Sequence, residues 1–396
     1  MKGGCVVNKN IKLTHLEGMR ALMAINVLLC HFVCAYYPQM YFLGSKYEGP
    51  LTLFATSPLS VLVNGNIAVV FFFALTGFLV GRSVFIKNAT ANDIFNKTFN
   101  RYVRLLPIVV ISTFFTFLTM KFGLQSHLDI VNENVNINFL SEYCNFDATI
   151  INLISNSFFN PFITNSAYIG PFWTIKYEFW GYIVVFILAL SLKESRLRRI
   201  GYIVTAIIFG LCLDTYYSIF VLGLFVADLE FNRTPAIFDK YYSKLLTNKI
   251  FVLCCFFAST YFSCCPLYEN NPLYAFWFKI PVVHSNLLRG LGMAMFIYVC
   301  MHSGVLQKVL SFKPLTFLGE MSFETYAIHW PLMLTCQAAL FLNFEKHFKY
   351  DIAALLAFVI TVIVIYIASF VLNIIVKKIN KAISYLQSKC IYKLTV

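Results

Sequence analysis

Apolar residues occur along this chain in long runs separated by short polar segments. A helix of about 20 apolar residues can cross the hydrocarbon core of a bilayer. The pattern predicts ten such helices, at residues 17–37, 59–82, 102–121, 174–192, 199–213, 215–229, 249–264, 286–303, 321–342 and 351–376. The fifth and sixth are short and are separated only around Asp214. We therefore expect an all-α fold: one polytopic transmembrane helical bundle, 1–396, with no internal repeat and no appended soluble domain.

The positions of Lys and Arg predict the orientation of this bundle. With the N-terminus inside, most of the 31 basic residues fall in inner segments, as the positive-inside rule requires. The inner set includes Lys2, Lys9, Lys12, Lys240 and Lys244, and the outer segments hold Lys46, Lys121, Lys279, Lys346 and Lys349. We expect both termini in the cytoplasm and the chain in the cell inner (plasma) membrane. The basic start is followed by no A-x-A site, so a cleaved signal peptide is not expected.

The segment 122–172 is predicted to be external and is much longer than a simple connection. It is rich in Asn and carries four acidic residues, Asp129, Glu133, Glu142 and Asp147. Loops of this length usually have a function, and we expect this one to cap an outer opening. Cys144, Cys264 and Cys265 lie in or near outer segments, and their spacing leaves a disulfide among them open.

The composition excludes the main alternatives to a membrane protein. Hydrophobic residues make up 59% of the chain and charged residues 12%, with a mean hydropathy of +0.72. A soluble domain carries about 25% charged residues, and 42 Phe and 23 Tyr exclude a disordered chain. The net charge of +13 is explained by topology, so no nucleic-acid partner is expected. The 12 Cys form no CxxC and no zinc spacing, so no bound metal is expected.

Charged and polar residues inside the first three apolar runs are the first candidates for function, because such groups are costly within a membrane. Arg20 and His31 are eleven residues apart, which places both on one helix face with a rise of about 16 Å. His31 then lies near mid-membrane, where it could act as a base. Arg82, Arg101 and Arg104 gather at the inner mouth and suit an anionic ligand. The simpler alternatives are that the arginines anchor the inner surface and that His31 is a packing residue.

Two later runs carry the other candidates. Glu178 follows Trp173 by about 7 Å of helix, in the outer third, and needs a partner from another helix because Lys176 faces elsewhere. The ninth run contains Glu324, then Tyr326, His329 and Trp330 before a kink at Pro331. His329 falls near the depth of His31, which indicates either a proton relay or a coincidence. Arg289, Asp214 and His302 lie near the ends of runs, where snorkelling explains them.

These residues form a series across the membrane: basic groups inside, histidines in the middle, a carboxylate with aromatic residues outside. Such an order suits transfer of an activated group from a phosphate-bearing cytoplasmic carrier to an outer acceptor. Histidine is a suitable general base near neutral pH, and a base can activate an acceptor hydroxyl to attack a thioester.

The motifs that carry these residues resemble those of acyltransferase family 3, the integral membrane O-acyltransferases. LEGMR with CHF ten residues later is similar to the family's L-D-G-x-R…H-F, and FFFALTGFL to its F-F-x-x-S-G-F-L. RYVRLLP is similar to R-x-x-R-x-x-P, WTIKYE to W-S-L-x-x-E, and GEMSFETYAIHWP to G-x-x-S-Y-x-x-Y-x-x-H-x-P. The resemblance covers about residues 13–376. Five motifs in one order are far more specific than any one of them.

The resemblance implies an O-acetyltransferase of cell-envelope glycans. Its acyl donor would be cytoplasmic acetyl-CoA, a substrate and not a permanently bound cofactor, and its acceptor a sugar hydroxyl of an extracytoplasmic or lipid-linked glycan. Carried over to this chain, the catalytic residues would be His31, Arg20, Glu178 and His329. The CoA phosphates would bind Arg82, Arg101 and Arg104, and the substrate-binding residues would be Trp173, Tyr326 and Trp330.

Departures from the family pattern limit what can be carried over. Glu17 replaces the usual Asp, Thr76 replaces Ser, and Val70 stands where many members have an acidic residue. The end of the last run lacks the family's acidic residue and Pro. Many relatives have an additional esterase-like domain that is absent here, so the chain would transfer directly or hand over to a separate glycan-assembly partner.

Two other functions fit the same architecture. A polysaccharide or small-molecule transporter would also have intramembrane charges, although the chain has no inverted repeat. A membrane scaffold would need the buried charges to pair only with one another. The sequence leaves open the glycan, the hydroxyl, the acyl group, a covalent or direct transfer, and the oligomeric state.

Overall fold

The computed structural model describes residues 13–44, 46, 48–87, 89–212, 214–237, 239, 248–266, 272–280 and 284–394. The predicted inner cations Lys2, Lys9, Lys12, Lys240 and Lys244 lie outside these residues. The helices are α1 (Thr14–Tyr36), α2 (Thr52–Thr56), α3 (Gly65–Lys87), α4 (Asp93–Lys121), α5 (Ile137–Ser141), α6 (Ile150–Phe158), α7 (Asn160–Ile163), α8 (Trp173–Leu192), α9 (Arg198–Cys212), α10 (Thr215–Phe231), α12 (Lys249–Ser263), α13 (Ser285–His302), α14 (Gly304–Leu310), α15 (Lys313–Glu320), α16 (Ser322–Leu332), α17 (Ala338–Phe344) and α18 (Tyr350–Leu394). Short 3₁₀ turns occur at Pro38–Met40, Pro58–Leu62, Ser126–Asp129, Gly170–Phe172 and Trp277–Lys279, and a π-helix at Met333–Gln337.

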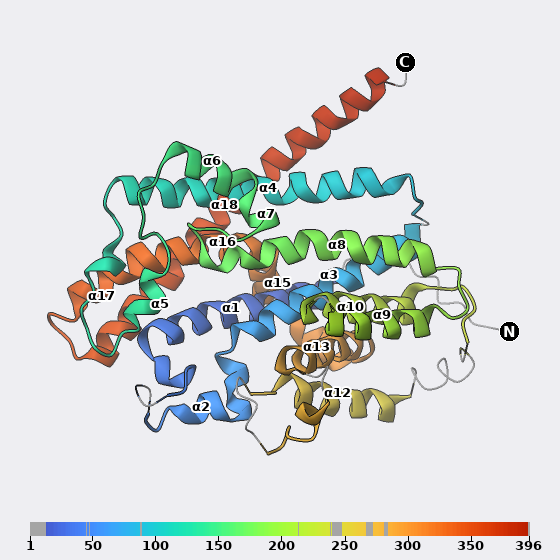
Figure 1. Cartoon of the computed structure of the whole chain (residues 1–396), viewed down its shortest axis with the longest axis horizontal. Coiled ribbons are helices and arrows are strands. Elements are labelled where there is room, and N and C mark those ends of the chain that lie inside the picture. Colours follow the sequence, from blue (N-terminus) through green and yellow to red (C-terminus); the bar gives the residue numbers. More distant parts are fainter. Residues whose placement is uncertain are drawn as a thin grey trace.

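The all-α class is confirmed, and a helix lies in each of the ten predicted ranges. The long helices run side by side along the long axis of the molecule (Figure 1). Six of the described helices are long and apolar enough to cross a membrane, or up to seven if α13 and α14, bent by 99°, form one span. The helices α9, α10 and α12 have 15, 17 and 15 residues. A total of ten spans therefore stays a prediction, as does the cytoplasmic location of both termini.

Two helices extend furthest beyond their predicted ranges. Helix α4 begins at Asp93 instead of residue 102, because its first turns are polar and a hydropathy pattern does not detect them. Asp93 fixes this start by accepting hydrogen bonds from the backbone N–H (2.8 Å) and hydroxyl (3.2 Å) of Thr90. Helix α18 continues from the predicted end at 376 to Leu394 and projects from the bundle (Figure 1).

Glycines allow α3 and α10 to touch backbone to backbone. A Cβ at Gly77 would lie 1.9 Å from the Phe220 carbonyl oxygen, and one at Gly81 would lie 2.6 Å from Ala227 Cβ. The contact is reciprocal, because a Cβ at Gly223 of α10 would lie 1.9 Å from a carbonyl oxygen of α3. This close packing positions the centre of the bundle.

We expect Gly223→Ala to lower the stability of the bundle by about 1–3 kcal/mol, because the added methyl group forces the two backbones apart. The measurement is the thermal unfolding midpoint of the purified protein in detergent. Gly304→Ala is the matched control, since a Cβ there meets nothing within 4 Å. Equal midpoints for the two variants would contradict the assigned packing.

Two groups of basic residues are buried and form hydrogen bonds within the protein, so they do not snorkel to the membrane surface. Asp228 is fully buried and accepts hydrogen bonds from Arg198 Nε (2.7 Å) and Arg199 Nε (3.1 Å). Arg289, which snorkelling was expected to explain, is 1% exposed and donates to the backbone carbonyls of Cys265 (2.9 Å) and Pro266. The snorkelling interpretation of Arg289 is therefore wrong, because its guanidinium donates hydrogen bonds to buried backbone carbonyls within the protein.

Candidate active site

Two histidines from opposite ends of the chain meet inside the bundle. His31 of α1 and His329 of α16 have their rings stacked, with centroids 4.9 Å apart and planes 8° from parallel. His31 Nδ1 lies 2.8 Å from His329 Nε2. His329 is 1% exposed, whereas His31 is partly exposed. The sequence predicted that the two histidines lie at a similar depth, and in the structure they are in direct contact.

The hydrogen bonds of His329 define where the protons of this pair lie. His329 Nδ1 is 2.6 Å from the carbonyl oxygen of Tyr326, which can only accept, so Nδ1 carries the proton in the neutral ring. His329 Nε2 is then the acceptor of a hydrogen bond from His31 Nδ1–H. This leaves the lone pair of His31 on Nε2, for which the described residues provide no hydrogen-bond donor. The arrangement presents one unprotonated nitrogen, as a general base requires.

Aromatic side chains close the side of the pair that faces the predicted external loop. Trp330 packs edge-on against His31 at 5.2 Å, and Phe139 of α5 lies 6.3 Å from the same ring. Phe139 and Tyr143 also pack edge-on against Trp330, at 5.5 and 5.6 Å. The segment 122–172 thus folds over the histidines, and its hydrophobic residues are part of the core that contains Trp330.

A π-helix follows the second histidine and links it to the same loop. Pro331 lacks an N–H, and the helix widens just after it, at Met333–Gln337. His127 of the loop places Nδ1 3.1 Å from the Leu334 carbonyl oxygen of this π-helix. Burial lowers the pKa of His127 and keeps it neutral, with Nδ1–H as the donor. The π-helix just after Pro331 is therefore a site where the loop is attached, and the kink at Pro331 stays a prediction.

A carboxylate and an arginine meet at a second polar centre. Glu178 Oε2 accepts hydrogen bonds from Arg101 Nη2 at 2.5 Å and from the Thr76 hydroxyl at 2.9 Å. The Arg101 guanidinium also lies over the ring of Tyr182, 5.2 Å from its centroid. The partner predicted for Glu178 from another helix is confirmed.

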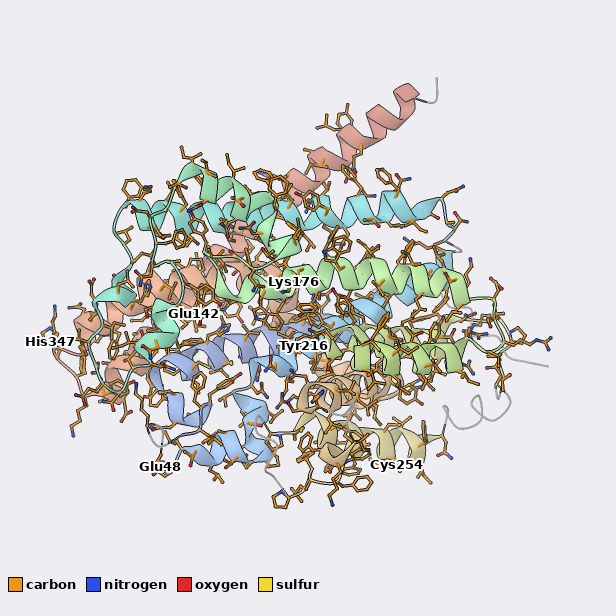
Figure 2. All side chains as sticks on the ribbon, viewed as in Figure 1. Glu48, Glu142, Lys176, Tyr216, Cys254 and His347 are labelled. Atoms are coloured by element: carbon orange, nitrogen blue, oxygen red, sulfur yellow. The ribbon has the colours of Figure 1, made fainter. Side chains whose placement is uncertain are left out.

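The predicted depths of Arg101 and Glu178 are wrong, because side chains in contact cannot lie at the inner mouth and in the outer third. Arg101 is about 12 Å into α4, because that helix begins at Asp93. The beginning of α8 is not at the outer surface: Lys176 lies near the middle of the molecule, whereas His347 marks one end of its long axis (Figure 2). The loop before α8 enters the bundle and covers the beginning of that helix, so counting inward from residue 173 overestimated its height.

Further charged residues adjoin this centre. Arg20 forms an ion pair with Glu17 at 3.0 Å. The positive charges of Arg20 and Arg101 both repel the charge of Arg104. The negative charge of Glu324 attracts that of Arg104, and the Glu324 carboxylate accepts a hydrogen bond of 3.1 Å from the Asn373 amide. Three arginines and three carboxylates therefore lie on the side of the histidines toward the predicted cytoplasm: Arg20, Arg101, Arg104, Glu17, Glu178 and Glu324.

Comparison with protein families assigns the chain to a family. The family model described as an acyltransferase domain matches residues 13–374, nearly the whole chain. The chain belongs to this acyltransferase family. It is the family that the sequence motifs resemble, and with several long apolar helices the acyltransferase is a multi-pass membrane protein. No curated protein and no solved structure matches the chain.

The acyltransferase does not bring every predicted residue to the histidines. Arg82 lies 5.7 Å over the ring of Phe231 at the end of α10. Trp173 packs on Tyr177 and Tyr216, at 5.8 and 5.4 Å, in a separate aromatic cluster. These contacts do not reach the histidines, so they do not support the CoA-binding role predicted for Arg82 or the substrate-binding role predicted for Trp173, whereas Trp330 packs on His31.

Tyr326 is held by groups at the beginning of α8. Its hydroxyl lies 2.7 Å from the Thr174 hydroxyl and donates to the carbonyl of Pro171. Because its own backbone carbonyl receives His329 Nδ1–H, this anchoring also fixes the second histidine. Tyr326 thus contributes through its backbone as well as through its ring.

Several residues at the site were not found by sequence reasoning. Phe139 and His127 lie in a loop, where no helical spacing marks them, and Asn373 was one polar residue in a long apolar helix. The three outer cysteines are free thiols in the structure, and Cys144 donates to the Tyr168 carbonyl at 3.1 Å. Burial raises the pKa of the Cys144 thiol to about 12. Among the described residues no group of three His, Cys, Asp or Glu side chains could hold a metal ion.

Proposed function

We propose that this acyltransferase moves an acyl group, acetyl from cytoplasmic acetyl-CoA, to a sugar hydroxyl of an extracytoplasmic or lipid-linked glycan. The observation that carries the proposal is the hydrogen-bonded pair of His31 and His329 within the bundle. The pair has cations on one side and the external loop on the other. A base there can reach both an acyl donor and an acceptor.

In the proposed reaction His31 Nε2 takes the proton of the acceptor hydroxyl while the hydroxyl oxygen attacks the thioester carbonyl. His329 Nε2 accepts a hydrogen bond from His31 Nδ1–H and stabilises the imidazolium that forms. The tetrahedral intermediate then expels the CoA thiolate, which takes the proton from His31 Nε2. Every bond that forms and breaks is accounted for, and the ring returns to its starting tautomer.

The cations suit the phosphates of the donor, with unequal roles. Arg101 is already bound to Glu178, so we propose that Glu178 positions this guanidinium. Arg20 is likewise paired with Glu17. Arg104 would then provide most of the charge for the CoA phosphates, since guanidinium groups bind phosphate in a bidentate manner. Tyr326 and Trp330 would line the acyl position, and the bilayer would supply a lipid-linked acceptor laterally.

The test uses membranes that contain the chain, supplied with acetyl-CoA labelled in the acetyl group. Label should enter envelope glycan, and membranes without the chain should incorporate none. Unlabelled glycan with intact acetyl-CoA would reject this donor and acceptor. Glycan that accumulates inside cells lacking the chain, with normal acyl content, would favour the transporter alternative.

Phe139 provides a further test, because it covers His31 from the loop side and would exclude water. We expect Phe139→Ala to raise the fraction of acetyl-CoA that is hydrolysed instead of transferred several-fold. The measurement is the ratio of free acetate to acetylated acceptor. Phe146→Ala is the control, because Phe146 lies in the same loop but its ring packs on Tyr168. An unchanged ratio in Phe139→Ala would refute the covering role.

A further inference from the structure

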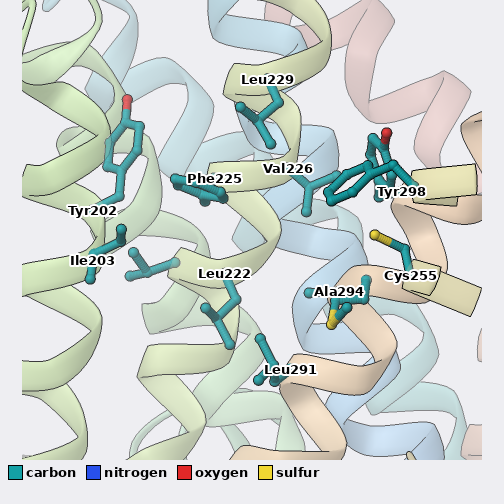
Figure 3. Close-up of a pocket in the computed structure, with 13 residues that line it drawn as sticks. Tyr202, Ile203, Leu222, Phe225, Val226, Leu229, Cys255, Leu291, Ala294 and Tyr298 are labelled. Carbon is teal, nitrogen blue, oxygen red and sulfur yellow. The ribbon is translucent and has the colours of Figure 1, made fainter. Parts of the chain in front are cut away.

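A groove remote from the histidines lies between two pairs of helices. Its cavity has a volume of about 360 Å³. Helices α10 and α13 form the floor, with Leu222, Val226 and Ala294, and α9 and α12 form the walls, with Ile203 and Cys255 (Figure 3). The lining is apolar, so a polar substrate would gain nothing here.

The groove opens toward the lipid. Among the lining residues, Ile203 of α9 is 50% exposed, and Leu222, Phe225 and Phe251 are partly exposed. Such side chains face hydrocarbon in a multi-pass membrane protein, so the occupant arrives from the bilayer. An acyl chain matches both the lining and the direction of access.

Two exposed cations follow or precede groove-lining residues at one end of the groove. Leu229 and Tyr298 lie at this end, and Leu291 lies at the other (Figure 3). Arg233 lies two residues beyond the end of α10, which carries Leu229, and Lys249 begins α12, which carries the lining residue Phe251; both cations have exposed side chains. Lys249 also adds its charge to the positive end of a helix dipole.

The acidic residues nearest this end are already paired. Asp228 binds two arginines, and Glu230 lies 2.7 Å from His302 Nε2. Among the described residues, no carboxylate is paired with the exposed cations Arg233 and Lys249, which can therefore bind an outside anion.

A buried hydroxyl at the same end has no partner. Tyr202 is fully buried, its hydroxyl points toward the Leu229 end, and no hydrogen bond satisfies it among the described residues (Figure 3). An unsatisfied buried hydroxyl is costly. An ester or phosphate oxygen of a bound lipid would accept its hydrogen bond.

We propose that this groove binds one anionic phospholipid, with an acyl chain along α10 and α13 and the phosphate at Arg233 and Lys249. Basic sites between transmembrane helices select acidic headgroups in this way. The lipid would hold α9 and α12 against the bundle, because α9 packs on α10 and α12 packs on α13. The site is separate from the proposed acyl transfer and does not depend on it.

The test is native mass spectrometry of the purified full chain in detergent, titrated with phosphatidylglycerol or phosphatidylcholine. One phosphatidylglycerol should bind about tenfold more tightly than phosphatidylcholine. Leu222→Trp fills the groove and should abolish this binding. Ile208→Trp, on an exposed face of α9 that points away from Ile203, should leave it unchanged.

A second variant keeps the test decisive if Leu222→Trp does not fold. The double substitution Arg233→Gln and Lys249→Gln changes only exposed side chains and should reduce phosphatidylglycerol binding to the level of phosphatidylcholine. Lys121→Gln with Lys279→Gln is the charge-matched control. Equal binding of the two lipids by wild type, or equal binding by both charge variants, would overturn the proposal.

Discussion

His31→Ala lowers the rate of acyl transfer by about 10²- to 10⁴-fold, the range that general base catalysis contributes. The alanine removes the only ring nitrogen of the pair that is unprotonated and without a donor among the described residues. The fold should persist, because His31 is partly exposed and other aromatic rings surround the space it leaves. The measurement is the initial rate of label transfer at saturating acetyl-CoA, with variants matched for folded protein.

The second histidine makes this prediction more specific. His329→Ala should also slow transfer, because His31 would lose the acceptor that fixes its tautomer. Adding His329→Ala to His31→Ala should cost little more, since groups that act as one unit are not additive. His15→Ala is the control, because His15 is a buried histidine near the beginning of the same helix. Full activity of His31→Ala would exclude the proposed base.

Glu178→Ala destabilises the bundle by about 3 kcal/mol, because it leaves the Arg101 guanidinium uncompensated in a largely buried place. The Thr76 hydroxyl also loses its acceptor. The measurement is the thermal unfolding midpoint of the purified protein in detergent. Acyl transfer should fall as well, since Arg101 would no longer be held in position.

A double substitution tests whether Arg101 and Glu178 stabilise the bundle as a pair or independently of each other. Arg101→Leu combined with Glu178→Leu should recover much of the stability that Glu178→Leu alone loses, because no unpaired charge remains. Glu142→Ala, an exposed carboxylate in the loop, should have no effect. Additive losses in the double variant would show that the two side chains do not depend on each other.

The sequence predicted the elements of this protein well, because hydropathy records which residues face lipid or core. It also predicted that His31 and His329 lie at a similar depth. The contact of these histidines required knowledge of which helices are neighbours, and α1 packs on α16 through residues far apart in the chain.

The largest errors came from assuming that each helix begins at a membrane surface. Glu178 was placed too near the outer surface, because the loop before it enters the bundle. Arg101 was placed too near the cytoplasmic surface, because α4 begins with two additional polar turns. Phe139 escaped notice because a loop residue carries no periodic signal. The functional contacts therefore depend on the parts of the chain that hydropathy describes least.

The most direct test of the account separates donor and acceptor across a membrane. Sealed vesicles would hold the chain in one orientation, with acetyl-CoA labelled in the acetyl group on the side of Arg104 and glycan acceptor on the side of the loop 122–172. The account predicts labelled acceptor on the loop side and free CoA on the donor side, with neither in His31→Ala vesicles. Label that reaches the acceptor only when both substrates share one side would contradict transfer through the histidine pair.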